Sequence, residues 1–292
     1  MSEQISEKPF AEKKKINIRG HQMAYIDEGK GTPIIFQHGN PASSYLWRNI
    51  MPYLKGKGRL IAPDLMGMGD SEKLDPSLGK NRYSYSEQYN YFTELINTLC
   101  PNEKVILVLH DAGSLVGFNW ANKHRDLVIG IAYMESIVAP LEMNDFPKFM
   151  QIDLPPDGLE GTLKDPPFLV EKLLLTKREF TEFEKSVYRA PFKNVGEDCR
   201  PVISFDIPVN GYPEYTTKIS ADYSEWMSTN ELPKLLIKGD PGYLIRNRTY
   251  EICKKWKNQT EVNVKGRHFI QEICPKEIGE AIAKFVDKIL NK

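Results

Sequence analysis

The sequence lacks the features that mark several functional classes. Its 39 Lys and Arg residues are balanced by 39 Asp and Glu residues, so no net charge is available to recruit a polyanion. We therefore do not expect the chain to bind nucleic acid or an anionic membrane. No segment approaches the roughly 18 consecutive apolar residues of a membrane-spanning helix. This composition favours a small, largely neutral hydrophobic substrate.

Cysteine is also scarce. The chain has four cysteines, and none of them is spaced like a zinc site or a CxxC redox motif. We expect reduced structural thiols, with no metal and no organic cofactor. The N-terminal residues lack the apolar core of a signal peptide, so we expect a cytoplasmic protein with a flexible tail over residues 1–12. We also expect a monomer.

Apolar runs alternate with helical segments along most of the chain. Residues 105–109, Val-Ile-Leu-Val-Leu, are apolar at every position, which is typical of a central parallel strand covered on both faces. The pattern predicts an α/β fold with a mostly parallel, eight-stranded sheet flanked by helices. Besides a hairpin within residues 14–28, we predict strands over residues 33–36, 60–62, 129–134, 233–238 and 260–265, and helices over residues 44–54, 86–99, 114–124 and 275–290.

The alternation stops between residues 140 and 230. A stretch of about 90 residues is too long for a loop in a compact domain. We predict that residues 140–230 form a helical cap, inserted into a core made of residues 13–139 and 231–292. A chain of 292 residues suits one large domain with such an insertion.

The residues after the central strand carry the first chemical signal. Asp111 and Gly113 stand between this strand and the next helix, with the spacing of a nucleophile elbow, in which a strained turn exposes the middle side chain. The GxSxG motif itself is absent, because Asp111 replaces the serine and Leu109 replaces the first glycine. The alternative is that Asp111 only caps the helix.

A carboxylate nucleophile forms an ester, and hydrolysis of that ester requires a general base. His268 follows the last predicted strand, where an α/β-hydrolase presents its base, and we expect its ring to be neutral near pH 7 so that it accepts a proton from water. An acid must orient this ring. Two residues at strand ends compete for that role, Glu135 and Asp240, and the spacing does not choose between them.

The same reaction requires donors for the negative charge that develops on oxygen. We expect the backbone N–H groups of Asn40 and Ala112 to form this oxyanion hole, one from the loop after the third strand and one from the residue after Asp111. The Asn40 amide could also donate to a leaving anion. Alternatively, Asn40 only shapes the turn in which it lies.

Four segments resemble the haloalkane dehalogenases, which are α/β-hydrolases, and the similarity extends over nearly the whole chain. It implies that Asp111 is the nucleophile, His268 the base and Glu135 the acid. It also implies an α/β-hydrolase fold, cleavage of carbon–halogen bonds through an aspartyl ester to give alcohol and halide, and a role in detoxification. The segments are residues 38–48, 62–69, 130–135 and 268–272.

One position departs from the family's pattern. Haloalkane dehalogenases usually carry a tryptophan directly after the nucleophile, and its indole N–H holds the departing halide, whereas this chain has Ala112. Loss of one such donor costs on the order of a hundred- to thousandfold in rate. Residues 201–211 also form a shorter segment than usual, with Phe205 where a tryptophan is common.

Three alternatives remain open. Coelenterazine-using luciferases of the Renilla type share this scaffold, so oxidation of such a substrate by oxygen is one. Epoxide hydrolases are similar at the elbow but require tyrosine donors from the cap. The third is a non-catalytic homologue that binds a small hydrophobic ligand, although the presence of Asp111, Glu135 and His268 together argues against it. The cap tyrosines available to an epoxide hydrolase are Tyr188, Tyr212, Tyr215 and Tyr223.

Overall fold

The computed structural model describes residues 5–146, 148, 168–194 and 196–291. Residues 1–4 of the predicted tail, residues 147, 149–167 and 195 of the predicted cap, and residue 292 of the predicted core lie outside the described residues. Within the described ranges, no helix is long and apolar enough to cross a membrane.

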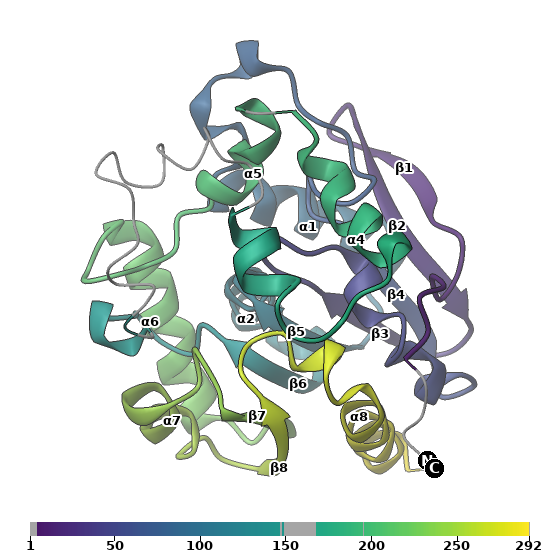
Figure 1. Ribbon diagram of the computed structural model, residues 1–292. Coiled ribbons are helices and arrows are strands. Elements are labelled where there is room, and N and C mark those ends of the chain that lie inside the picture. The colour runs from purple at the N-terminus through teal and green to yellow at the C-terminus, as the bar shows by residue number, and fades with distance from the viewer. Residues whose placement is uncertain (1–4, 147, 149–167, 195, 292) are drawn as a thin grey trace.

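Eight strands form one sheet in the order β1-β2-β4-β3-β5-β6-β7-β8. β1 and β2 form an antiparallel hairpin, β2 pairs antiparallel with β4, and the remaining neighbouring pairs are parallel. The predicted mostly parallel sheet is therefore confirmed (Figure 1). The strands are β1 Lys14–Ile18, β2 His21–Gly29, β3 Pro33–Gln37, β4 Arg59–Pro63, β5 Val105–Asp111, β6 Val128–Ser136, β7 Lys234–Pro241 and β8 Gln259–Gly266.

The longer helices occur close to where the sequence predicts them. The exception is the stretch over residues 44–54, which forms two short 3-10 turns, η1 Ser44–Trp47 and η2 Met51–Leu54, and no α-helix. A further 3-10 turn, η11 Ile270–Glu272, follows β8. The α-helices are α1 Tyr85–Leu99, α2 Ala112–Lys123, α4 Glu182–Arg189, α5 Arg200–Ile203, α6 Glu214–Thr229, α7 Asn247–Cys253 and α8 Pro275–Leu290, and a π-helix, η8, covers Phe168–Leu174.

The central strand β5 supplies side chains to both faces of the sheet. Because successive side chains of a strand point to opposite faces, Ile106 and Val108 pack with α8 and η2, while Leu107 and Leu109 pack with α1 and α2. All seven residues of β5 are buried. The apolar run that predicted a doubly covered strand therefore places the end of β5, and Asp111 with it, at the centre of the fold.

The predicted cap segment divides into two parts. Helices α4 and α5 lie over the sheet (Figure 1), and an apolar cluster joins this part to the loops that follow β3, β7 and β8. Helix α6 packs instead with the core, because its Tyr223 and Met227 belong to the same cluster as α2. The members of the cap cluster include Val170, Leu173, Leu174, Phe180, Tyr188 and Phe192 from the cap, and Ala42, Tyr45, Tyr243 and Phe269 from the loops.

Part of the predicted flexible tail has specific contacts. The main-chain oxygen of Ser6 accepts a hydrogen bond from Arg48 Nε at 2.9 Å, and the Tyr45 hydroxyl donates to the main-chain oxygen of Glu7. These contacts tie the stretch to the loop after β3. The flexibility of the rest of the predicted tail stays a prediction.

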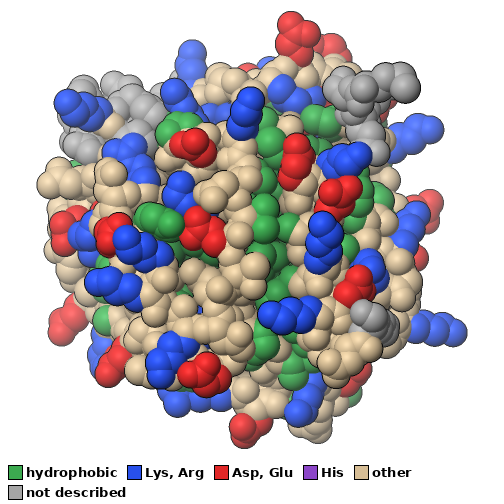
Figure 2. Space-filling model, turned by 90° about the horizontal axis from the view of Figure 1, so that it is seen from below, with side chains coloured by type: hydrophobic (Ala, Val, Ile, Leu, Met, Phe, Trp, Pro, Cys, Tyr) green, Lys and Arg blue, Asp and Glu red, His purple; other side chains and the backbone are tan. Residues whose placement is uncertain are grey.

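The surface shown in Figure 2 carries charges of both signs. Basic and acidic side chains are interspersed there, and neither sign forms a continuous patch on this face. This arrangement agrees with the balanced composition and offers no extended field for a polyanion on the side that is shown.

We expect Gly113→Ala to destabilise the fold. An added Cβ at Gly113 would lie 2.1 Å from the main-chain oxygen of His38, and a backbone atom cannot move aside as a flexible side chain can. The free energy of unfolding should fall by an amount at the upper end of the ~1–3 kcal/mol typical of overpacking. Urea titration would measure it, with Lys123→Ala at the exposed end of the same helix as control. Equal stability of the two variants would contradict this account.

Candidate active site

Asp111 lies at a strained turn between β5 and α2. Its φ of 50° and ψ of −135° are unfavourable for a residue with a side chain, and such strain concentrates at functional sites. The turn is crowded, because a Cβ at Gly39 would lie 2.4 Å from Asp111 Oδ1. Glycine at position 39 therefore allows the loop after β3 to approach the Asp111 carboxylate.

The three residues of the predicted triad come together. His268 Nε2 lies 3.2 Å from Asp111 Oδ2, and its Nδ1 lies 3.4 Å from Glu135 Oε2. Asp111, Glu135 and His268 are 7%, 0% and 4% exposed, so the group is nearly closed to solvent. The imidazole therefore bridges two carboxylates at the ends of neighbouring strands, β5 and β6.

The geometry separates the two candidate acids. Glu135 Oε2 accepts hydrogen bonds from the backbone N–H groups of Tyr243 and Leu244, at 2.7 and 2.9 Å, in addition to its contact with His268. Asp240 is exposed near the end of β7. The structure therefore brings Glu135, and not Asp240, to the imidazole.

The two oxygens of Asp111 have different surroundings. Oδ1 accepts the backbone N–H of Asn40 at 2.8 Å, whereas Oδ2 faces His268. Burial alone would raise the pKa of Asp111, but the hydrogen bond and charge of His268, together with the backbone N–H of Ala112, lower it. The result is an ionised carboxylate with one oxygen held by the backbone and the other beside the imidazole.

The expectation of a neutral His268 ring near pH 7 is wrong for this state of the protein. Burial alone would lower the pKa of His268, but hydrogen bonds to Asp111 and Glu135, and their charges, outweigh burial and raise the pKa to about 9. At pH 7 the ring is therefore protonated and donates to both carboxylates. It can act as a base only after one of them has lost its charge.

Asn40 contacts both the nucleophile and the cap. Its backbone N–H binds Asp111, while its side-chain Nδ2 donates to the main-chain oxygen of Val202, in α5, at 3.3 Å. Within the described residues, the Asn40 side-chain oxygen is buried without a hydrogen-bond partner. Asn40 therefore donates hydrogen bonds to both the nucleophile and the cap.

The positions of the missing tryptophans are filled by smaller or less polar groups. Ala112 is fully buried, and Phe205 is 3% exposed with its ring edge-on to Tyr85 at 6.1 Å. Neither side chain can donate a hydrogen bond. Ala112 therefore contributes only its backbone N–H to the site.

The four cap tyrosines do not gather at Asp111. No contact found for them within the described part of the chain involves the nucleophile, so the epoxide hydrolase alternative gains no support. The hydroxyl of Tyr188 donates to Glu272, that of Tyr215 to Asp206 and that of Tyr223 to the main-chain oxygen of Ile137, while Tyr212 is 77% exposed.

Sequence reasoning assigned no role to His110. This side chain is fully buried, and its Nε2 lies 3.0 Å from the main-chain oxygen of His268. Because a carbonyl only accepts, His110 Nε2 carries the proton and donates. Burial, with the nearby charge of His268, lowers the pKa of His110 to about 3, so this ring stays neutral while it holds the His268 backbone.

Metal-binding groups are also absent from the described ranges: no cluster of three or more His, Cys, Asp or Glu side chains there could hold a metal ion. All four cysteines lie in the described ranges, where they are buried and form no disulfide. Burial raises the pKa of Cys253 to about 12 and that of Cys100 to about 11, so these thiols stay protonated and unreactive at neutral pH.

Comparison with known proteins identifies the family. Residues 32–273 match the model of the alpha/beta hydrolase fold family. A haloalkane dehalogenase of Sphingobium indicum is 50% identical over 293 aligned residues, which cover 98% of each chain. This chain belongs to the haloalkane dehalogenase family. The predicted resemblance and fold are thereby confirmed.

One solved structure and one further relative show what else this chain is similar to. The crystal structure of haloalkane dehalogenase DbeA from Bradyrhizobium elkani has a TM-score of 0.88 at 31% identity, covering 96% of this chain and 99% of that one. A coelenterazine h 2-monooxygenase of Renilla reniformis is 35% identical and covers 96% of this chain and 92% of its own. The scaffold therefore occurs with two different chemistries.

We expect Asp111→Asn to lower the pKa of His268 from about 9, because the ring loses one of its two anionic partners. An adjacent opposite charge changes a pKa by about one to three pH units. Nitrogen-15 NMR titration of the imidazole would measure the change, and an unaltered pKa would contradict it.

Since the folded pKa of His268 lies above the ordinary value of 6.5, the stability due to its protonation is complete below about pH 6.5 and is lost as the pH rises through about 9.

Proposed function

We propose that this protein is a haloalkane dehalogenase that uses Asp111 as nucleophile, His268 as base and Glu135 as the acid that orients the base. The observation that carries the proposal is the His268 ring between Asp111 Oδ2 and Glu135 Oε2, at 3.2 and 3.4 Å. The 50% identical relative is named a haloalkane dehalogenase, which agrees with this chemistry.

In the first step, Asp111 Oδ2 attacks the carbon that bears the halogen. A carbon–oxygen bond forms, the carbon–halogen bond breaks, and its electron pair leaves with the halide. The buried site helps this step, because a carboxylate with little hydrating water is a stronger nucleophile than one in bulk solvent. The Asn40 amide lies between Asp111 and the cap and supports the leaving halide.

In the second step, a water molecule hydrolyses the ester. Esterification removes the charge of Asp111, which is one of the two charges that raise the pKa of His268, so the ring releases its proton and becomes a base. It then activates water for attack on the Asp111 carboxyl carbon. The backbone N–H groups of Asn40 and Ala112 stabilise the negative charge on the carboxyl oxygen. The bond between the carboxyl carbon and Oδ2 then breaks, and the alcohol leaves with one proton of the water while the other stays on His268. The carboxylate is restored, and the halide and the proton that the ring first released pass to solvent.

The presence of Ala112 next to the nucleophile is one reason to keep the coelenterazine monooxygenase as an alternative function. Without a side-chain donor for the halide, dehalogenation loses an interaction worth on the order of a hundred- to thousandfold in rate. The Renilla relative, which is 35% identical to this chain, is named a coelenterazine h 2-monooxygenase. Light emission with coelenterazine would support that alternative. Binding of a hydrophobic ligand without turnover would support a non-catalytic homologue.

From the sequence we also propose a cytoplasmic location, a monomeric state, a role in detoxification and no cofactor. The division into a core of residues 13–139 and 231–292 and a cap of residues 140–230 is likewise a proposal. The seating of α4 and α5 over the loops after β3, β7 and β8 supports the division.

We expect the wild type to release bromide and alcohol slowly from short bromoalkanes. The Ala112→Trp variant should release both products faster. The indole N–H would add one donor to the developing halide, for a gain of roughly a hundredfold. Halide detection and gas chromatography would measure both products, with the melting temperature as a check that the larger side chain is accommodated. If neither protein releases halide while coelenterazine is oxidised, the proposed function is wrong.

We expect Glu135→Gln to block hydrolysis of the ester, and Asp240→Asn to have little effect. Glu135 holds the imidazole, whereas Asp240 is exposed. Mass spectrometry after quenching should show Asp111 with an added alkyl group in Glu135→Gln and not in Asp240→Asn. The reverse pattern would move the acid to β7.

A further inference from the structure

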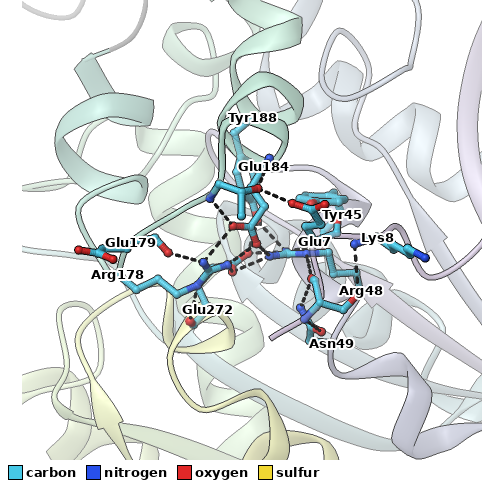
Figure 3. Close-up of polar contacts among 12 residues, drawn as sticks. Glu7, Lys8, Tyr45, Arg48, Asn49, Arg178, Glu179, Glu184, Tyr188 and Glu272 are labelled. Carbon is cyan, nitrogen blue, oxygen red and sulfur yellow. Dashed lines mark hydrogen bonds and ion pairs between the residues drawn. The ribbon is translucent and has the colours of Figure 1, made fainter. Parts of the chain in front are cut away.

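A buried network of four charged residues joins the cap to the core (Figure 3). Arg48 follows η1 and Glu272 ends η11, both in the core, while Glu184 lies in α4 and Arg178 precedes that helix. Each arginine contacts both glutamates. The side chains of Arg48, Glu184 and Glu272 are 1% exposed and that of Arg178 is 18% exposed.

Both carboxylate oxygens of Glu272 accept hydrogen bonds within this network. Its Oε1 accepts from Arg48 at 2.6 Å and from the Tyr188 hydroxyl, and its Oε2 accepts from Arg48 at 2.8 Å and from Arg178 at 2.7 Å. Arg178 Nε also donates to the main-chain oxygen of Glu272 at 3.1 Å. Both the side chain and the backbone of Glu272 are therefore held, and the cap supplies part of the hold.

Only a short, hydrogen-bonded turn separates Glu272 from His268. The backbone N–H of Glu272 donates to the carbonyl of Phe269 at 3.1 Å, and Cys274 N–H donates to that of Ile270 at 2.8 Å. Phe269 is fully buried, with its ring centroid 4.8 Å from that of His268. Because this turn is hydrogen-bonded and packed, we expect a displacement of Glu272 to move the imidazole of His268 as well.

The network is complete only when the cap is seated. Arg178 and Glu184 come from the cap, so their withdrawal would leave Arg48 and Glu272 paired with each other but with half of their charged contacts. Loss of such contacts is unfavourable, because buried charges depend on their partners and hydrogen bonds to offset the cost of desolvation. The network therefore links the seat of the cap to the conformation of the loop after β8.

We propose that Glu272 is a positioning residue that holds His268 in register with Asp111 and Glu135, and that Arg178 makes this hold depend on the seated cap. The proposal rests on the proposed function for its kinetic consequence. Formation of the ester uses Asp111 and Asn40, whereas hydrolysis uses His268. Loss of the hold therefore slows hydrolysis more than it slows ester formation.

Arg178→Gln is the sharpest variant, because it removes a partly exposed cap residue and leaves the core pair of Arg48 and Glu272 in place. In rapid mixing with a bromoalkane, we expect a halide burst close to one per site, followed by steady turnover reduced by up to about a hundredfold, since a misplacement near 1 Å can cost that much. Arg178→Lys, which keeps the charge, should recover part of the loss.

Glu182→Gln is the matched control, because it removes a charge from α4, the helix that Arg178 precedes, at an 84% exposed position. It should behave like the wild type. If Arg178→Gln lowers the burst and the steady rate in the same proportion, the residue only supports folding and the proposal is overturned. Glu272→Gln should show the same separation of the two phases as Arg178→Gln.

A second measurement does not depend on turnover. Loss of the Arg178 positive charge would by itself raise the pKa of His268 above its value of about 9, whereas a ring displaced from Asp111 and Glu135 would have a lower pKa. We expect NMR titration of Arg178→Gln to show the lower value, and an equal or higher value would overturn the proposal. If the wild type releases no halide, the proposed function fails while this titration still decides the role of Arg178.

Discussion

The structure depends on one imidazole held between two buried carboxylates. The His268 ring bridges Asp111 and Glu135, and burial would make each of these charges costly if it stood alone. The protonated ring and the backbone N–H groups that donate to both carboxylates together stabilise these two negative charges. The loops after β3, β5, β6 and β8 must all meet at this point.

The fold could be predicted from the sequence because its pattern is local. A fully apolar run marks β5, and the alternation of strands and helices marks the sheet. The helix expected over residues 44–54 was not found, since that stretch forms separate 3-10 turns. The site could be predicted only in part. Glu135 and Asp240 both lie near strand ends, and only the register of the sheet decides which of them reaches His268.

The electrostatics of the site could not be derived from the sequence. The pKa of His268 depends on its distances from Asp111 and Glu135, and a linear pattern contains no distances. The Arg48 and Glu272 contacts were missed for a similar reason, since 224 positions separate the partners in the chain. The signal that could have found them is a charged residue inside an otherwise apolar stretch, as at Arg48 after Tyr45, Leu46 and Trp47.

The buried network between cap and core has a consequence for the protein in saline surroundings. Dissolved ions weaken attractions between charges at a surface, because the screening length falls to about 3 Å at 1 M salt. The exposed pair of Lys218 and Asp222 would lose its attraction under those conditions. The pair of Arg48 and Glu272 would keep its attraction, because burial excludes mobile ions from it. Concentrated salt should therefore leave the cap seated over the site.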